Sequence, residues 1–202
     1  MCSNRGMTEG SRPSGRVGRL CGRRAALGML GSVAAAGLTW ARAADVTLEL
    51  TPVDHEGLMQ EVARRRGKVV VLDCWSTSCP PCVREFPGLV RLAAAHPEGV
   101  ACLSLALDYE GIGAFEEAVP PVRDFLQQVG ADRLVNLIAT EEADSMYTKL
   151  DLAGVPAVFI WRPDGSLAVR YDDDHAATTL GRPFTYADVE STVNELLATA
   201  RR

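Results

Sequence analysis

The stretch of this chain that most restricts its fold runs from Val69 to Pro87 and reads VVVLDCWSTSCPPCVREFP. It opens with four apolar residues, three of them β-branched, which indicates a short strand buried on both faces. After the strand, a helical pattern begins at Cys79. Cysteines three residues apart on a helix lie on one face, where their sulfur atoms can close a disulfide. The stretch therefore predicts a buried strand that leads a cysteine pair into the start of a helix.

The position of Cys79 at the expected helix start has a chemical consequence. Free N–H groups and the helix dipole favour a thiolate there, and the thiolate is the nucleophilic form of cysteine. We therefore expect Cys79 to be the attacking thiol and Cys82, one turn further in and more buried, to be the resolving thiol. Neither Pro80 nor Pro81 has an N–H to donate to that thiolate. This favours a less acidic Cys79 and a couple that is either a reductant or of intermediate reduction potential.

The same stretch resembles the thioredoxin superfamily, and more closely its exported branch, the TlpA/ResA-like thiol–disulfide oxidoreductases. Farther along, Gly154-Val155-Pro156 followed by an apolar strand is similar to the cis-proline loop of that family. The resemblance covers residues 46 to 200. It implies an α/β, thioredoxin-like fold with a central mixed β-sheet and helices on both faces, and a redox-active disulfide. The matching residues of the first stretch are Asp73, Trp75, Cys79, Pro81, Cys82, Arg84 to Pro87 and Leu89.

The resemblance also implies roles for four residues outside the cysteine pair. Asp73 matches the buried acid that moves the proton of the second cysteine, with a pKa raised by burial; the alternative is a strand-end cap. Trp75 matches a family aromatic expected at the substrate-binding surface, and its alternative is core packing. The Val155 backbone is expected to pair with an extended client segment, and Pro156 to lie in cis beside Cys79.

Three further features have a structural and a chemical interpretation. Cys74 points away from Asp73 by strand alternation, and together with Cys102 it forms either a buried thiol pair or, as we favour, two inert core residues. Glu110 follows a predicted strand where relatives place an acidic residue near the disulfide, but a solvated loop charge is the simpler interpretation. The run from Asp172 to His175 is interpreted as a solvated polar loop rather than a metal site.

The first 43 residues are predicted to be a signal peptide of the twin-arginine type, and residues 44–202 the thioredoxin-like domain. Arg23-Arg24 precedes a weakly apolar run from Ala25 to Trp40, and Ala41-Arg42-Ala43 has the small-x-small pattern of a cleavage site. A disordered basic tail and an uncleaved membrane anchor are the alternatives. We expect a periplasmic or other extracytoplasmic location, with membrane association only if the signal stays attached.

The charge balance and the number of cysteines limit which classes of partner this chain is expected to bind. The first 43 residues hold 7 of the 21 basic and 1 of the 26 acidic residues, which leaves 14 basic, 25 acidic and a net charge of −11. This balance argues against nucleic acid as a partner. Four of the six cysteines lie outside the predicted signal, too few for a disulfide-stapled scaffold. The expected partners are client proteins with disulfides and a membrane or periplasmic thiol donor; no cofactor and no metal are expected.

Hydrophobic periodicity and turn residues predict a mostly alternating order of strands and helices. Pro87 should kink the helix that contains it, and Pro120-Pro121 should start another. The strands are expected at 46–50, 68–75, 100–107, 134–138, 157–161 and 167–171. The helices are expected at 54–66, 79–96, from 120 onward, 142–150 and 186–200, with loops at 109–119 and from 172.

The function favoured by these observations is that of an exported thiol–disulfide oxidoreductase that reduces client disulfides. A copper-handling protein of the same fold is one alternative, although related copper chaperones space their cysteines CxxxC. A thiol peroxidase is another, although Ser76 stands where peroxiredoxins carry threonine. A non-catalytic binding domain is disfavoured because both Cys79 and Cys82 are present.

Overall fold

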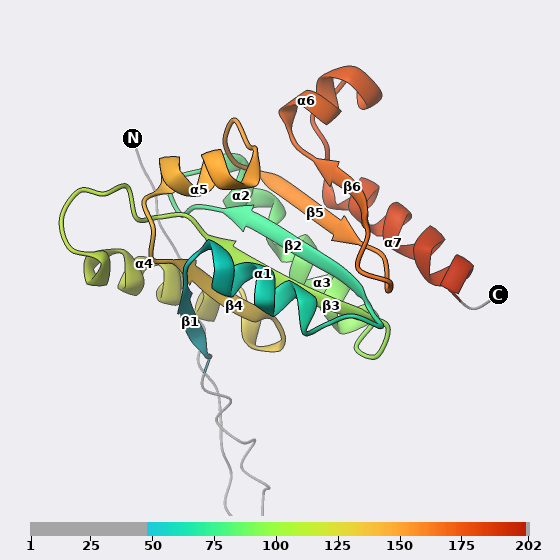
Figure 1. Ribbon diagram of the computed structural model, residues 1–202, viewed down its shortest axis with the longest axis horizontal. Helices are drawn as coiled ribbons and strands as arrows, with labels where there is room; N and C mark the ends of the chain where they lie inside the picture. Colours follow the sequence, from blue (N-terminus) through green and yellow to red (C-terminus); the bar gives the residue numbers. More distant parts are fainter. Residues whose placement is uncertain (1–47, 201–202) are drawn as a thin grey trace, which may run out of the picture. The chain divides into compact units, whose positions relative to one another are not determined.

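The computed structural model describes residues 48–200, and the predicted signal peptide lies outside them. Six strands form one mixed sheet in the order β1-β4-β3-β2-β5-β6 (Figure 1). The first four strands in this order run parallel, and β5 and β6 are each antiparallel to their neighbour. The strands are β1 (Leu50–Val53), β2 (Val69–Trp75), β3 (Val100–Ala106), β4 (Val135–Ala139), β5 (Ala157–Trp161) and β6 (Leu167–Tyr171).

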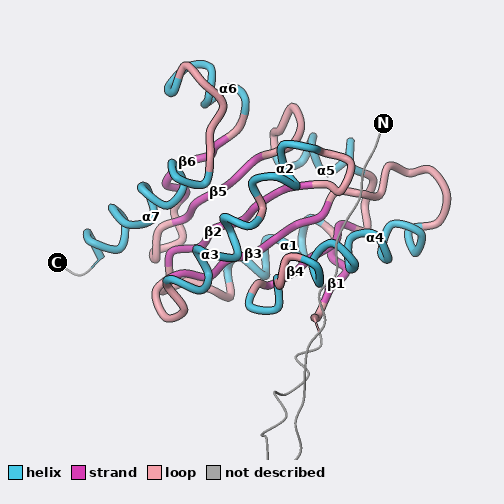
Figure 2. The backbone as a smooth tube through the Cα atoms, turned by 180° about the vertical axis from the view of Figure 1, so that it is seen from behind, coloured by secondary structure: helices cyan, strands magenta, loops and turns pink. Residues whose placement is uncertain are grey.

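Helices cover both faces of this sheet, as the α/β prediction requires (Figures 1 and 2). One face packs against α2, α3, α4 and α7, and the other against α1 and α5, so the buried side chains form two separate cores. The helices are α1 (His55–Ala63), α2 (Pro80–Glu85), α3 (Pro87–Ala95), α4 (Phe115–Gln128), α5 (Ala143–Leu150), α6 (Asp173–His175) and α7 (Tyr186–Ala200).

Strand β2 lies near the middle of the sheet, between β3 and β5. Each of its seven residues is buried. Val69, Val71 and Trp75 belong to the core under α2, α3, α4 and α7, whereas the apolar side chains that alternate with them belong to the core under α1 and α5. A strand that is apolar on both faces can lie only between two layers of helix. The end of β2, where the cysteine pair follows, is therefore held from both sides.

The helix predicted at 79–96 is divided by Pro87. The structure has α2 and α3 on either side of Phe86, whose φ of −50° and ψ of −37° keep the backbone helical. Pro87 has no N–H and its ring crowds the preceding turn, which bends the helix at this point. The kink is confirmed, and it separates a short helix that carries the cysteines from a longer helix that packs on the sheet.

Several boundaries differ from the sequence-based expectations, and three of the differences have a clear physical reason. The first described strand is β1, at Leu50–Val53, because its position is set by parallel pairing with β4 rather than by local alternation. Helix α4 begins at Phe115, so Pro120 and Pro121 lie inside it. The carbonyls that lose a partner there belong to Glu116 and Glu117, which are exposed and can bond water.

The third difference concerns the segment after β6, which was expected to be a loop. It contains α6 and a π-helical turn, Ala176–Leu180. The Asp172 carboxylate accepts a hydrogen bond from the His175 N–H at 2.9 Å, which caps this short helix. The run of aspartates is therefore partly a capping sequence.

The start of α1 gives a first test of the fold. The Asp54 carboxylate accepts a hydrogen bond from the Gly57 N–H at 2.8 Å, as the predicted N-cap should. We expect Asp54→Ala to lower the free energy of unfolding by about 1 kcal/mol, measured by urea denaturation. Asp124→Ala, which removes an exposed carboxylate on α4, should change it by less than about 0.5 kcal/mol. Equal losses in the two variants would contradict the capping role.

Candidate active site around the cysteine pair

Cys79 and Cys82 are joined by a disulfide at the end of β2. Cys79 is the N-cap of α2, and its sulfur accepts a hydrogen bond from the Cys82 N–H at 3.3 Å. Cys82 is 3% exposed, whereas Cys79 is only partly buried. The predicted placement of the two sulfurs, one at the helix start and one a turn further in, is confirmed. An attacking partner can therefore approach Cys79 more easily than Cys82.

The loop that joins β2 to Cys79 is tied to the end of β3. Asp108 accepts a hydrogen bond from the Thr77 N–H at 2.9 Å and a second from the Thr77 hydroxyl. The Cys79 N–H donates to the Ser76 carbonyl at 3.2 Å, which closes a turn. Burial raises the pKa of Asp108 above its usual value, partly offset by the bonds from Thr77. Asp108 thus fixes the loop from which the first cysteine projects.

Asp108 is a residue that sequence reasoning missed. Glu110 is exposed, as the favoured interpretation of a solvated loop charge requires, and the acid that contacts the cysteine loop lies two residues earlier. A signal was available: Asp108 follows a strand parallel to β2, and the carboxyl ends of neighbouring parallel strands meet at one edge of a sheet. The acidic residue that relatives place near the disulfide is therefore matched here by Asp108 rather than by Glu110.

Asp73, in the middle of the sheet, is 4% exposed. Burial raises the pKa of its carboxyl group from 3.8 to about 7, because removal from water disfavours the charged form. The Tyr186 hydroxyl donates a hydrogen bond to Asp73 Oδ2 and partly offsets that rise. The partner of the carboxyl group is thus a buried side chain, which differs from the contacts of a strand-end cap.

Tyr186 is the second residue that sequence reasoning missed as part of the site. It begins α7, 113 positions after Asp73, and is 6% exposed. Its spacing within α7 identifies a core position, as for Val189 and Val193. Nothing local shows that its hydroxyl reaches the central strand, because that contact depends on how α7 packs against the sheet.

A cavity of about 210 Å³ lies beside the disulfide. Its lining includes Asp73 and Cys82, so the acid and the inner cysteine face one space. Pro156 closes another part of the wall, and Phe184 and Tyr186 from the end of the chain complete it. At about 30 Å³ of liquid volume per molecule, the cavity is large enough for several waters. A proton can therefore pass between Cys82 and Asp73 without direct contact between them.

The structure places Val155 and Pro156 where the resemblance implied. The peptide bond between them is cis. The Val155 carbonyl oxygen lies 3.7 Å from the Cys79 sulfur atom, although 76 residues separate them in the chain. The predicted proximity of this loop to the outer cysteine is confirmed, and the Val155 backbone borders the surface on which a partner would reach Cys79.

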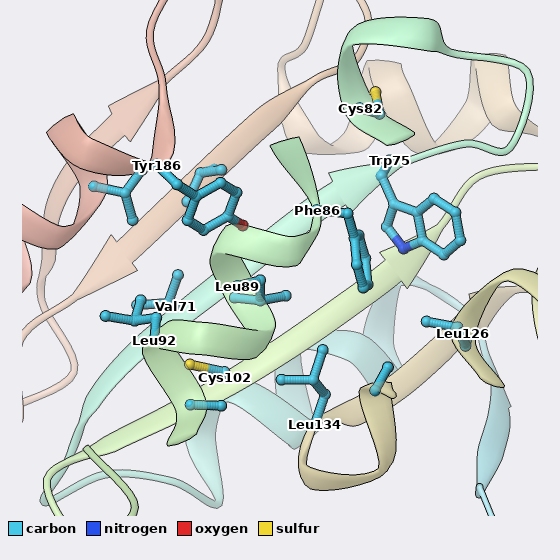
Figure 3. Close-up of a cluster of buried hydrophobic side chains, with 14 of the residues drawn as sticks. Val71, Trp75, Cys82, Phe86, Leu89, Leu92, Cys102, Leu126, Leu134 and Tyr186 are labelled. Atoms are coloured by element: carbon cyan, nitrogen blue, oxygen red, sulfur yellow. The ribbon is translucent and has the colours of Figure 1, made fainter. Parts of the chain in front are cut away.

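Trp75 does not lie at a binding surface. It is fully buried, and its ring centroid lies 4.8 Å from those of both Phe86 and Phe125. Figure 3 shows the Trp75 ring beside that of Phe86. The substrate-binding role expected for Trp75 is therefore wrong, because a client segment cannot reach the ring. Side chains of β2 point alternately to the two faces of the sheet, and that of Trp75 points into the core under α2 and α4. This placement removes the large apolar surface of the indole ring from water.

The two remaining cysteines of the described chain, Cys74 and Cys102, are buried and reduced. Cys74 belongs to the core under α1 and α5, and Cys102 to the core on the opposite face of the sheet. A thiol pair between them is excluded by this placement. Burial raises the pKa of Cys102 to about 12 and also raises that of Cys74 well above its usual value, so both are inert core residues, as favoured above.

The acidic run near His175 does not gather into a metal site. Asp172 forms an ion pair with Arg170, at 2.5 Å, in addition to its capping bond to the His175 backbone. Over residues 48–200, no group of three or more histidine, cysteine or acidic side chains is placed to hold a metal ion.

Comparisons with known proteins agree with this geometry. The chain is 38% identical over 58 residues to the thiol–disulfide oxidoreductase ResA of Halalkalibacterium halodurans, a match covering 29% of this chain and 33% of ResA. It is 29% identical over 125 residues to the soluble secreted antigen MPT53 of Mycobacterium tuberculosis, covering 61% of this chain and 65% of that protein. The chain thus spans about a third of the first relative and just under two thirds of the second.

A solved structure shows the same fold. The crystal structure of a thioredoxin-like superfamily protein matches with a TM-score of 0.51 and 22% identity, covering 67% of this chain and 84% of the other. No family model matches the chain. With a mixed sheet covered on both faces and a disulfide at the end of its central parallel strand, the chain has a thioredoxin-like fold, and its sequence is similar to that of ResA, which supports a ResA- and TlpA-like protein of the thioredoxin superfamily.

Proposed function

We propose that this protein is an exported thiol–disulfide oxidoreductase that reduces the disulfides of client proteins through Cys79 and Cys82. The observation that carries the proposal is the asymmetry of the pair. One sulfur is partly exposed at a helix start, and the other is buried beside a cavity that it shares with an acid of raised pKa. Thiol exchange needs these two environments, because one thiol must meet the client and the other must resolve the complex.

The reaction takes place in two exchange steps. In the first, the Cys79 thiolate attacks one sulfur of a client disulfide, forms a mixed disulfide and releases the first client thiolate. In the second, Cys82 loses its proton to Asp73 and attacks the Cys79 sulfur. The Cys79–Cys82 disulfide forms, the mixed disulfide breaks and the second client thiolate leaves. Two electrons pass from the dithiol to the client, and a membrane or periplasmic dithiol donor must return them.

The client segment is proposed to bind along the Val155 backbone. The Val155 carbonyl lies 3.7 Å from the Cys79 sulfur, so an extended segment that pairs with this backbone would bring its own sulfur close to Cys79. Backbone pairing gives affinity with little dependence on sequence, which suits a reductant of several clients. Pro156 lines the cavity behind this segment.

Export rests on residues 1–43. In the described part of the chain, no helix has the length and apolar character needed to cross a membrane. We expect protein isolated from its host to begin at Ala44 or within a few residues of it, because Ala41-Arg42-Ala43 has the pattern of a cleavage site. Edman sequencing or intact mass would measure this, and protein that retains Met1 or Cys2 would refute cleavage.

The function is tested with purified protein and a disulfide substrate. Residues 44–202 should accelerate the reduction of insulin by dithiothreitol, followed by the turbidity of the released chains. The reduction potential of the Cys79–Cys82 couple, measured against glutathione, would fix the direction of electron flow. A rate equal to that of dithiothreitol alone, or a potential as oxidising as that of DsbA, about −120 mV, would contradict a reductant.

A further inference from the structure

The contact between Tyr186 and Asp73 joins the last helix to the central strand. The Tyr186 hydroxyl donates a hydrogen bond to Asp73 Oδ2, and both side chains are buried. In Figure 3 the Tyr186 ring points from α7 into the core. Both residues line the cavity next to Cys82. The hydroxyl therefore meets the carboxyl group inside the proposed active site.

Helices α2 and α3 leave room for the Tyr186 ring. A Cβ atom at Gly88 would lie 2.2 Å from Tyr186 Cγ and 2.3 Å from its Cβ, distances at which no real contact occurs. Gly88 is buried in the first turn of α3. One turn before it, Glu85 Oε2 accepts a hydrogen bond from the Tyr186 N–H at 3.4 Å. The absence of a side chain at Gly88 and the bond to Glu85 set where the tyrosine lies.

The surroundings of Asp73 supply few compensating charges. Cys74, Cys102 and Tyr186 all have pKa values raised by burial, so they stay neutral at physiological pH. Among the polar contacts of the described residues, the Tyr186 hydroxyl is the partner that the structure gives to the Asp73 carboxyl group. The other titratable groups that line the cavity are Arg84, Glu85 and Asp173, while Cys82 is bonded to Cys79.

We propose that Tyr186 is a positioning residue for Asp73, which holds the carboxyl group toward the cavity shared with Cys82 and stabilises its ionised form. A donor aimed at a carboxylate favours the charged state. Burial acts in the opposite direction and is the larger influence. The tyrosine thus offsets part of the cost of burial and keeps the acid usable as a proton acceptor near neutral pH.

The catalytic role given to Tyr186 rests on the proposed function, whereas the experiment that tests the Tyr186–Asp73 contact does not depend on that function. If Cys82 gives its proton to Asp73 during resolution, the pH at which Asp73 ionises sets the pH at which resolution becomes fast. Without the Tyr186 hydroxyl, Asp73 would ionise at higher pH, and the rate profile of resolution would move upward with it. The titration itself is a property of the oxidised protein and needs no substrate.

The test compares wild-type protein with Tyr186→Phe, which removes only the hydroxyl. In the oxidised protein, infrared spectroscopy follows the C=O band of the protonated Asp73 carboxyl group, assigned by its loss in Asp73→Asn. We expect a midpoint of about 7 in wild-type protein and an upward shift of about one pH unit in Tyr186→Phe. An unchanged midpoint in a folded Tyr186→Phe protein would overturn the proposal.

Tyr171→Phe is the matched control. Its hydroxyl also bonds to α7, at 2.7 Å from Thr192 Oγ1 and 3.2 Å from the Asp188 carbonyl, and it does not contact Asp73. This variant loses a buried tyrosine hydroxyl next to the same helix, so it should leave the Asp73 midpoint unchanged. An equal shift in both variants would overturn the specific role of Tyr186 and indicate a general loosening of α7.

Gly88→Ala is a second variant that should disturb the hydrogen bond between Tyr186 and Asp73. Its added Cβ would displace the Tyr186 ring, so the Asp73 midpoint should again rise, and circular dichroism would show whether the fold is kept. A midpoint equal to that of wild type in folded Gly88→Ala protein would contradict the placement argued here. If the midpoints move as expected but the protein does not accelerate insulin reduction, the proposed function fails and the role of Tyr186 stands. If insulin reduction is accelerated and no midpoint moves, the proposed function stands and the role of Tyr186 fails.

Discussion

Cys82→Ser protein should accumulate as mixed disulfides joined through Cys79, whereas Cys79→Ser should form none and should reduce insulin no faster than dithiothreitol alone. The reason is the different exposure of the two sulfurs: Cys79 is partly exposed and Cys82 is 3% exposed. Without Cys82 the first exchange step still occurs, but no thiol remains to break the mixed disulfide. Non-reducing electrophoresis and intact mass after incubation with an oxidised peptide would measure the adduct.

Cys102→Ala is the control for this experiment. Its thiol is buried, with a pKa raised to about 12, and it faces away from solvent in the core. The variant should keep both insulin reduction and the ability to resolve mixed disulfides, so any adduct seen with Cys82→Ser is attributable to the active pair. Mixed disulfides through Cys82 in the Cys79→Ser protein, at the level of the converse variant, would reverse the assigned roles.

The second large effect is expected from Asp73→Asn, which should make the protein more stable at pH 8 while making it a poorer catalyst. The pKa of the Asp73 carboxyl group is about 7 in the folded chain, whereas its ordinary value is 3.8. Between these values the unfolded chain binds fewer protons than the folded one, so the free energy of unfolding falls as pH rises. A pKa shift of this size lowers the free energy of unfolding by about 4 kcal/mol once the carboxyl group is ionised. Asparagine does not ionise, so the variant avoids this loss.

The same variant separates stability from chemistry. Urea denaturation at pH 4 and pH 8 should show a gain for Asp73→Asn at pH 8 and little difference at pH 4, whereas Asp124→Asn on the surface of α4 should match wild type at both. Resolution of a Cys79 mixed disulfide should slow on the order of 100-fold at pH 7, since general acid–base catalysis contributes about that much. Equal stability of Asp73→Asn and wild type at pH 8 would show that burial does not raise the pKa of the Asp73 carboxyl group.

The sequence was most informative where local pattern and long-range packing agree. The apolar run of β2, the hairpin of β5 and β6, and the span of α7 were all predicted within a residue. The cysteine pair, the buried acid and the loop at Val155 were found because each stands in a motif of a known family. Their close approach, across 76 residues from Cys79 to Val155, then follows from the fold rather than from any local signal.

The residues that were missed or misplaced have a common cause. Asp108 and Tyr186 act through contacts with residues distant in sequence, Thr77 at 31 positions and Asp73 at 113 positions. Trp75 was assigned to a binding surface because it matches a family aromatic, and only the packing of α2 and α4 shows that its ring is covered. Local periodicity gives the face of an element, but it does not give the neighbour that the face meets.

The placement of Cys74 and Cys102 on opposite faces of the sheet bears on how the chain would fold in the presence of an oxidant. Once β2 and β3 have paired, the sheet itself separates these thiols, and neither can reach the other without unfolding. Before that pairing, all the cysteines are available for wrong combinations. Correct oxidation therefore depends on the order of events: the chain must complete its two cores before an oxidant reaches it, and a refolding protocol should begin under reducing conditions.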